Sequence, residues 1–385
     1  MEYLGIKEAE LNKLGAIHTA CEIQQQPDVW QKIYNQLKID AGAIDQFMKE
    51  ATAEVDEIIL TGAGTSAYIG ICLQGDYRNN FGVNTTAIPT TDIVTHPHHY
   101  FNKNKKVLVV SFARSGNSPE SCAAVNLAEQ FSAKLFHLVI TCNKKGDLVT
   151  KSRKPIQQDI FLPEETNDIS LAMTSSFSGM LLSGILVSRI SDIDNQQKNV
   201  EAVVKYGRNI LNDYIEEIFK IAKLDFDRAV FLGSGHLFGT AVESSLKLQE
   251  LTDGNVICMK ESFLAFRHGP KAVIKNKTIV VFILSNDPHA RKYERDLVRT
   301  IKNEDVALSL IGVSAGNSDD LGLDFNIDYA TTPSDIDEAF LTVCGVMPAQ
   351  ILGFFKSIDM GFKPDSPSAS GTITRVVEPF VIYHK

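Results

Sequence analysis

The feature that most constrains the fold is a short unit that occurs twice in the chain. The segment VDEIILTGAGTSAYIG, which begins at residue 55, predicts an apolar strand, a tight turn containing Gly62 and Gly64, and then a helix. The segment DFDRAVFLGSGHLFG, which begins at residue 225, repeats this pattern, and Gly233 and Gly235 stand at the same offset. Two copies of one unit indicate an internal duplication, and such copies usually pack about a pseudo-twofold axis.

Further apolar segments alternate with helical ones after each copy. Strands alternating with helices are typical of parallel sheets covered on both faces. We therefore expect the α/β class, with two doubly wound parallel sheets in three α/β/α layers. The expected strands after the first copy are TTAIPTTDI (85–93), VLVVSF (107–112), KLFHLVITCN (134–143) and QQDIFLPEE (157–165), and those after the second are NVICMKE (255–261), TIVVFILSN (278–286) and ALSLIGV (307–313).

A chain of 385 residues is long for a single core, so two α/β domains are expected. A helical arm without strands precedes them, and its stripe of Trp30, Ile33 and Leu37 indicates core packing. A polar segment near residue 194 suggests the first boundary. The predicted organisation is a helical arm over 1–48, a first domain over 49–194, a helical linker over 195–222, a second domain over 223–350, and a helix and tail over 351–385 that close over the site.

Composition excludes several classes of function. A net charge of −9 and a pI near 5.5 argue against a nucleic-acid surface. We expect no membrane span and a cytoplasmic protein, because no apolar run of that length is evident and the start of the chain is polar. The six cysteines are scattered without a CxxC pair, so we predict no metal and no disulfide framework.

The segment VLVVSFARSGNSPE at 107–120 is typical of an anion-binding loop. A buried strand ends in hydroxyl-bearing residues and a glycine, and Pro119 suits the first turn of a helix. An anion could sit at that helix N-terminus, with hydroxyl donors from Ser115 and Ser118 and a charge-assisted bond from Arg114. The alternative is a βα turn whose hydroxyls only cap the helix, and this loop alone does not separate the two.

A second group of polar residues lies in the second half. Glu243, Lys247 and Glu250 share one face of a predicted helix, either as a solvated salt-bridged surface or as a partly buried group, since apolar residues surround them. A partly buried carboxylate can move a carbon-bound proton, and Glu250 is the candidate. His268 lies in a turn where it can either meet a ligand or simply be exposed.

These residues carry a resemblance to the tandem-domain members of the sugar isomerase (SIS) family. Within it, the chain most resembles the galactosamine-6-phosphate deaminase/isomerase group, through EIQQQPDVW (22–30) and PDSPSASGTITRVV (364–377). It is similar more distantly to the isomerase half of glucosamine-6-phosphate synthase. Two tandem SIS domains, each with a flavodoxin-like sheet, are the fold that this resemblance implies.

The resemblance also implies where the sugar phosphate binds. Leu171 to Thr174 would line the sugar. In this chain Ala113 and Arg114 stand where the synthase has serine and glutamine, which offers the phosphate a charged contact. The implied sugar-phosphate loops are Gly64, Thr65 and Ser66, and Arg114, Ser115, Gly116, Asn117 and Ser118.

The catalytic residues implied by the resemblance lie in the second half. Glu250 matches the proton-shuttling glutamate, Lys247 the lysine that precedes it, and His268 the histidine that opens the sugar ring. That histidine comes from the neighbouring subunit in the family, which implies a homodimer with a shared site. The synthase's tail lysine falls near Thr372, where this chain has none, and this argues against Schiff-base chemistry through the tail.

Three functions are compatible with these residues. The first is a deaminase/isomerase that converts galactosamine 6-phosphate into tagatose 6-phosphate and ammonia without a cofactor. The second is an aldose/ketose isomerase that releases no ammonia, and the third is a phosphosugar sensor, for which no basic helix-turn-helix precedes residue 50. A dinucleotide enzyme is disfavoured because Ala67 stands where a third glycine is expected.

Overall fold

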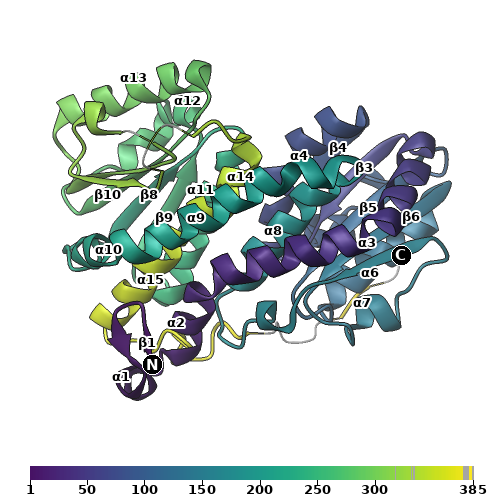
Figure 1. Cartoon of the computed structure of the whole chain (residues 1–385), viewed down its shortest axis with the longest axis horizontal. Coiled ribbons are helices and arrows are strands. Elements are labelled where there is room, and N and C mark those ends of the chain that lie inside the picture. Colours follow the sequence, from purple (N-terminus) through teal and green to yellow (C-terminus); the bar gives the residue numbers. More distant parts are fainter. Residues whose placement is uncertain (317, 331, 333, 376–380, 384–385) are drawn as a thin grey trace. The chain divides into compact units, whose positions relative to one another are not determined.

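The computed structural model divides into two compact units, each of which is described by itself (Figure 1). Each unit is built on one five-stranded, fully parallel sheet. The structure describes residues 1–316, 318–330, 332, 334–375 and 381–383. Unit 1 comprises residues 1–27, 169–174 and 201–373, and unit 2 comprises residues 28–168, 175–200 and 374–385.

The sheet of unit 2 has the strand order β4-β3-β5-β6-β7. Numbered along the chain this is 2-1-3-4-5, the flavodoxin-like order, in which ligands bind where the order reverses, outside the ends of the first and third strands. Those two strands here are β3 and β5. The strand bounds are Glu57–Thr61 (β3), Asn84–Ala87 (β4), Lys106–Ala113 (β5), Lys134–Thr141 (β6) and Gln157–Phe161 (β7).

Helices cover the sheet of unit 2. The long helix α3 begins at Gln26 with Pro27 in its first turn, and its Trp30 is fully buried and donates a hydrogen bond to Ser178 Oγ at 2.9 Å. The stripe of Trp30, Ile33 and Leu37 is therefore core. The helices are α3 (Gln26–Glu54), α4 (Thr65–Phe81), α5 (Thr90–Thr95), α6 (Pro119–Phe131), α7 (Asp147–Thr150) and α8 (Ser175–Val187), with 3-10 turns at Pro97–His99, Glu164–Thr166 and Ile190–Gln196.

The sheet of unit 1 repeats the same topology. Its order, β12-β11-β10-β8-β9, is again 2-1-3-4-5 when read from the other edge. The strands are β8 (Arg228–Leu232), β9 (Ile257–Glu261), β10 (Thr278–Leu284), β11 (Ser309–Ser314) and β12 (Phe325–Asp328). The helices are α1 (Glu8–Leu14), α2 (Ile17–Gln24), α9 (Gln197–Asp213, which begins in unit 2), α10 (Ile215–Ala222), α11 (His236–Leu251), α12 (Phe263–Phe266), α13 (Pro288–Glu304), α14 (Glu338–Gly345) and α15 (Met347–Asp359), with 3-10 turns at Gly269–Val273 and Asp319–Leu321.

The two glycine turns match in backbone conformation. Gly64 has φ 55° and ψ −129°, and Gly235 has φ 57° and ψ −127°. A Cβ on Gly62 would lie 2.6 Å from the Ser66 carbonyl carbon. A Cβ on Gly233 would lie 2.2 Å from the carbonyl oxygen of Leu237, which is also four residues further along the chain. The predicted duplication is therefore confirmed in topology and in local geometry.

Some local expectations were wrong. The start of the chain is not purely helical, because Glu2–Tyr3 (β1) pairs antiparallel with Ile6–Lys7 (β2). The segment TTAIPTTDI gives a strand only at β4 and then turns into α5, since Pro89 ends the strand pattern and precedes a helix. The strand β12 was not predicted.

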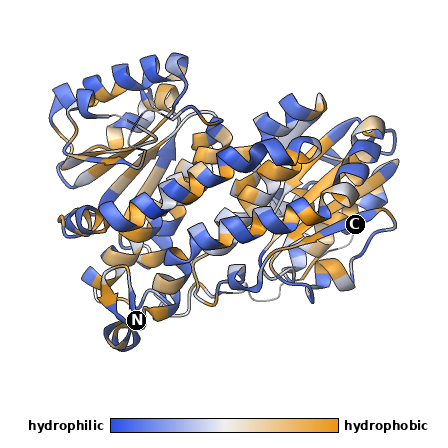
Figure 2. Cartoon of the chain, viewed as in Figure 1, coloured by the Kyte–Doolittle hydropathy of each residue, from blue (hydrophilic) through white to orange (hydrophobic). Residues whose placement is uncertain are grey.

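The C-terminal helices also differ from expectation. Together α14 and α15 span Glu338–Asp359, which has a mean hydropathy of 1.5 and the length of a membrane span. We expected no apolar run of that length. However, 94% of this stretch is buried inside the fold, as is common for a core helix. Figure 2 shows apolar residues gathered on the sheet strands and on inner helices, whereas α13 is largely polar.

A buried histidine makes unit 2 sensitive to acid. His137 on β6 is fully buried, with Nε2 2.9 Å from Ser111 Oγ and Nδ1 2.9 Å from Gln157 Oε1. Burial lowers the pKa of His137 from 6.5 to about 4. Between these values the unfolded chain binds a proton that the folded chain does not, so stability falls as the pH falls from about 6.5 to about 4.

We expect a His137→Gln variant to lose this acid sensitivity. Between pH 7.5 and pH 5 the unmodified chain should lose about 2 kcal/mol more unfolding free energy than the variant, because one pKa unit corresponds to about 1.4 kcal/mol. Urea unfolding followed by circular dichroism at both pH values measures this difference. Equal losses in the two proteins would show that His137 titrates normally in the fold.

Candidate functional site

The first candidate loop follows β3 at the reversal point of the unit 2 sheet. Gly64 ends the turn as the N-terminal cap of α4, and its positive φ favours glycine although a Cβ would find open space. Thr65 and Ser66 open the helix and are both buried. The N-terminus of this 17-residue helix carries a partial positive charge, which suits an anion.

The second candidate loop follows β5 and is braced by the loop after β6. Asn143 Nδ2 donates to the Ser115 carbonyl at 2.7 Å, and Leu148 N donates to the Gly116 carbonyl at 2.9 Å. Gly116 has φ +67°, and a Cβ there would lie 3.2 Å from Gly146 Cα. This close approach and the positive φ require glycine, so the loop has a fixed shape.

The side chains of this second loop have different tasks. Asn117 Oδ1 accepts a hydrogen bond from Asp147 N at 3.0 Å, so Asn117 braces the loop. Ser118 is the N-terminal cap residue of α6, but its side chain makes no capping hydrogen bond and instead lies 2.6 Å from Ser121 Oγ. Ser115 and Ser118 are both half-buried. The structure therefore does not favour the alternative that these hydroxyls only cap the helix.

Arg114 contacts the C-terminal tail. Its side chain is buried, with 8% exposure, and Nη2 donates to the Arg375 carbonyl oxygen at 2.6 Å. Arg375 in turn binds the segment after β7, because its Nε donates to the Asp168 carbonyl at 2.8 Å. The guanidinium of Arg114 thus joins the loop after β5 to the tail within unit 2.

In unit 1, α11 carries a buried charge cluster. Lys247 Nζ lies 2.6 Å from Glu250 Oε2 and 3.3 Å from Glu243 Oε1. The side chains of Lys247 and Glu243 are fully buried, and that of Glu250 is 22% exposed. Burial lowers the pKa of Lys247, but the two carboxylates more than offset this and hold that pKa above its usual value. The predicted face is therefore buried, and Glu250 is its only member open to solvent.

The other sugar-site candidates in unit 1 lie apart from this cluster in the chain. His268 lies on an exposed turn between α12 and the 3-10 turn Gly269–Val273, and its backbone N–H donates to the Ala265 carbonyl at 3.1 Å. Leu171 is half-buried and its N–H donates to the Asp365 carbonyl at 3.1 Å, whereas Thr174 is buried. The structure thus brings Lys247 and Glu250 into contact and presents the His268 ring to solvent.

Arg375 and Asp168 were not selected from the sequence, and Glu243 was named there only as a neighbour of Lys247 and Glu250 on one helix face. The sequence signal for Glu243 is the helical spacing that it shares with Lys247 and Glu250. Arg375 and Asp168 carry no local pattern, because their contacts join segments far apart in the chain.

The equivalent point of the unit 1 sheet has a different chemistry. A pocket of about 680 Å³ lies beside the turns after β8 and β10 and the start of α14. Asp287 accepts hydrogen bonds from the first N–H groups of α13, and Asp337 does so for α14. Glu338 also lines this pocket, and burial raises its pKa. Carboxylates thus occupy the helix ends that would hold an anion, so this pocket is unsuited to a phosphate.

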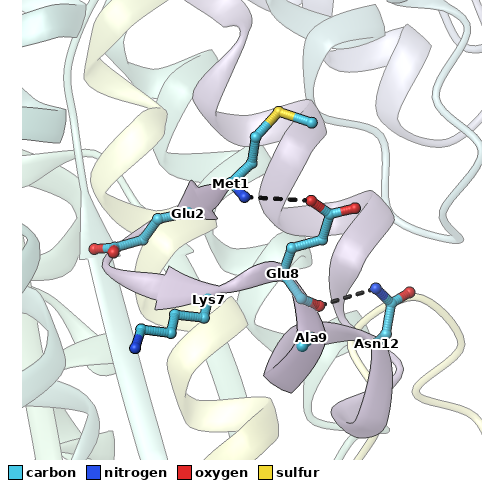
Figure 3. A pocket seen from close by; sticks show the side chains of 6 residues that line it. All are labelled: Met1, Glu2, Lys7, Glu8, Ala9 and Asn12. Carbon is cyan, nitrogen blue, oxygen red and sulfur yellow. Dashed lines mark hydrogen bonds and ion pairs between the residues drawn. The ribbon is translucent and has the colours of Figure 1, made fainter.

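A pocket of about 700 Å³ near the N-terminus is formed by residues of the β1-β2 hairpin and α1 and contains none of the candidate residues (Figure 3). Its polar contacts are local, since Glu8 pairs with the terminal amine at 3.5 Å and its carbonyl accepts from Asn12 Nδ2 at 2.9 Å. Within the described part of the chain, no three His, Cys, Asp or Glu residues gather as a metal site.

Comparisons with known proteins identify relatives of this chain. The SIS domain model matches residues 53–187. A curated D-galactosamine-6-phosphate deaminase from Shewanella sp. (strain ANA-3) is 38% identical over 379 residues, which cover 97% of this chain and 94% of that protein.

Two solved structures superpose along most of the chain. The crystal structure of tagatose-6-phosphate ketose/aldose isomerase from Escherichia coli has a TM-score of 0.84 and 35% identity, and covers 91% of this chain and 95% of that chain. A Clostridium novyi NT protein, described as a candidate enzyme of the same kind, has a TM-score of 0.97 and 34% identity over 100% of both chains. The tandem α/β architecture is therefore shared along its full length.

Proposed function

Because the chain belongs to the tandem SIS-domain family of D-galactosamine-6-phosphate deaminases, we propose that it converts galactosamine 6-phosphate into tagatose 6-phosphate and ammonia. The observation that carries this proposal is the α11 cluster, in which a buried ammonium holds Glu250 at 2.6 Å and leaves it open to a ligand. A positioned carboxylate of this kind is suited to moving a proton between two neighbouring carbons.

Each step of the reaction has a residue. His268 opens the sugar ring by moving a proton between the hydroxyl and the ring oxygen. Glu250 then takes the C2 proton of the open aldose and returns it to C1, while one proton of the 2-amino group passes to the C1 oxygen, which leaves a C1 alcohol and an imine at C2. Water adds to this imine and ammonia leaves, so the atoms balance without a cofactor. Lys247 stays protonated beside Glu250 and compensates negative charge as the proton moves.

The phosphate is assigned to the two loops of unit 2. Gly64, Thr65 and Ser66 offer a helix N-terminus, and Ser115 and Ser118 offer hydroxyl donors. Gly116 and Asn117 keep the second loop in shape. Leu171 and Thr174 are assigned to the sugar.

The cellular setting is also part of the proposal. We assign a cytoplasmic homodimer whose partner subunit supplies the ring-opening histidine, and the exposed turn of His268 supports this exchange. Neither nucleic acid nor a membrane is assigned as a partner. Sedimentation velocity, and mixing of Glu250→Gln with His268→Asn subunits, tests the assignment, because a shared site would regain activity in mixed dimers.

A plain aldose/ketose isomerase is the second candidate, favoured by the likeness to the Escherichia coli tagatose-6-phosphate ketose/aldose isomerase. The deciding experiment couples ammonia release to glutamate dehydrogenase, with galactosamine 6-phosphate, glucosamine 6-phosphate and the N-acetyl form in parallel. Ammonia from the galacto sugar alone is the expected result. Interconversion of tagatose 6-phosphate with its aldose, with no ammonia from any sugar, would favour the isomerase.

A double Ser115→Ala and Ser118→Ala variant should bind the phosphosugar more weakly. Each hydrogen bond lost from a protein hydroxyl to a charged ligand costs about 1.5 kcal/mol or more, so we expect the loss of two to raise KM by at least about a hundredfold while kcat changes little. Steady-state ammonia release measures both constants. Ser132→Ala, at the opposite end of α6, is the matched control, and an unchanged KM in the double variant would remove these serines from the phosphate site.

A further inference from the structure

The C-terminal tail contacts the loop-bearing edge of unit 2 through Arg375. Arg375 Nη2 donates to the Asp168 carbonyl at 2.5 Å and to Asn167 Oδ1 at 3.2 Å, and Nε donates to the same carbonyl at 2.8 Å. These acceptors belong to the segment that follows β7. Three hydrogen bonds from one planar guanidinium fix the direction of the side chain and hold the tail at this point.

The backbone of the same residue reaches the phosphate loop. The Arg375 carbonyl oxygen accepts a hydrogen bond from Arg114 Nη2 at 2.6 Å, and Arg114 directly follows β5. Arg114 therefore depends on the tail for one of its hydrogen-bond acceptors. Since the Arg375 side chain is anchored separately, its carbonyl is a fixed point against which the Arg114 guanidinium is oriented.

The two guanidinium groups lie close to a buried thiol and to a carboxylate. Cys142, which follows β6, lies near both guanidinium groups and near the Asp168 carboxylate. Burial raises the pKa of its thiol to about 12, while the charges of Arg114 and Arg375 act in the opposite direction. The Asp168 carboxylate itself accepts hydrogen bonds from Ser176 N at 2.9 Å and from Ser176 Oγ at 2.5 Å. The Asp168 carboxylate near these two cations is therefore already engaged by the start of α8.

We propose that Arg375 is a positioning residue for the substrate phosphate: it holds Arg114 at the phosphate loop through its carbonyl oxygen, and it anchors the tail through its guanidinium. This inference rests on the proposed function, because it assigns the tail to the binding of the phosphosugar. Arg114 is the residue that meets the phosphate, and Arg375 acts through it. The tail therefore contributes to affinity for the anion.

The geometry requires arginine at position 375. A lysine ammonium is one point of charge, whereas the guanidinium reaches a carbonyl and an amide oxygen with two nitrogens at once. Arg375→Lys should consequently restore only part of the function. The tail also contains Lys363, whose side chain packs beside Gly15 in unit 1 and which makes no hydrogen bond to the phosphate loop within the described residues. Lys363→Ala is therefore the matched control.

The test compares Arg375→Gln, Arg375→Lys, Arg114→Gln and the double Arg375→Gln/Arg114→Gln variant of the full-length chain. We expect KM for galactosamine 6-phosphate and the inhibition constant of inorganic phosphate to rise together by about tenfold in Arg375→Gln, less in Arg375→Lys and not at all in Lys363→Ala. Because Arg375 acts through Arg114, the double variant should be no worse than Arg114→Gln alone.

Other results would overturn this inference. A lower kcat with an unchanged inhibition constant for phosphate would show that the tail covers the sugar and not the anion. Multiplying effects in the double variant would show that the two arginines act independently. Calorimetric titration of inorganic phosphate into each variant tests the inference even if no sugar releases ammonia. Phosphate binding that depends on Arg375 would support the inference although the proposed reaction is wrong.

Discussion

Glu250→Gln is expected to reduce ammonia release by about 10²- to 10⁴-fold while phosphosugar binding persists. General acid–base catalysis contributes rate factors of this size, and an amide cannot take and return the C2 proton. In the unsubstituted chain Lys247 Nζ donates to Glu250 Oε2 at 2.6 Å, and glutamine keeps an oxygen that can accept this hydrogen bond. The Glu250 side chain is also 22% exposed, so the fold should tolerate the substitution. Steady-state kinetics with galactosamine 6-phosphate gives kcat, and titration calorimetry gives the affinity.

Two further measurements make this result specific. Glu304→Gln on α13 removes an exposed carboxylate that pairs with Lys271 and should leave kcat unchanged. Exchange of the C2 proton with deuterated solvent, followed by nuclear magnetic resonance, should stop in Glu250→Gln, since exchange needs the same base. If the variant keeps more than about a tenth of the rate, another group moves the proton.

The fold could be predicted from the sequence where apolar runs are continuous. The strands β5, β6 and β10 are buried along nearly their whole length, and such runs are typical of parallel sheets with helices on both faces. The strand β12 escaped prediction because its sequence FNID includes Asn326 and Asp328, which are uncommon in strands. Its position at the edge of the sheet tolerates these polar residues, and only the topology reveals it.

The candidate site could be predicted in part. The Gly64 turn has a local signature, because a positive φ at the start of a helix after a buried strand favours glycine. The α11 cluster follows from helical spacing, although only the structure shows that Glu243 and Lys247 are fully buried. The contact between Arg114 and the Arg375 carbonyl joins residues 261 positions apart, and no local pattern reports such a pair.

Because Lys247 is buried, the stability of the fold around α11 depends on the charge of this one side chain. Its ammonium is fully buried between two carboxylates, and α11 packs against α15. If the ammonium is removed, the fully buried Glu243 loses the cation 3.3 Å away, and an uncompensated buried charge typically costs about 3–5 kcal/mol. Removing both charges together is far less costly, because well-packed neutral side chains often replace a buried ion pair without loss of stability.

We therefore expect Lys247→Met to lower the unfolding free energy by about 3–5 kcal/mol and to abolish activity, whereas the double Glu243→Gln/Lys247→Met variant should regain most of the stability but none of the activity. Urea unfolding followed by circular dichroism measures the first effect and ammonia release the second. Lys223→Met, which removes an exposed partner of Asp359, should cost about 1 kcal/mol or less. A loss in Lys247→Met as small as in that control would mean that Glu243 is neutral in the fold. Lys247 would then serve Glu250 alone.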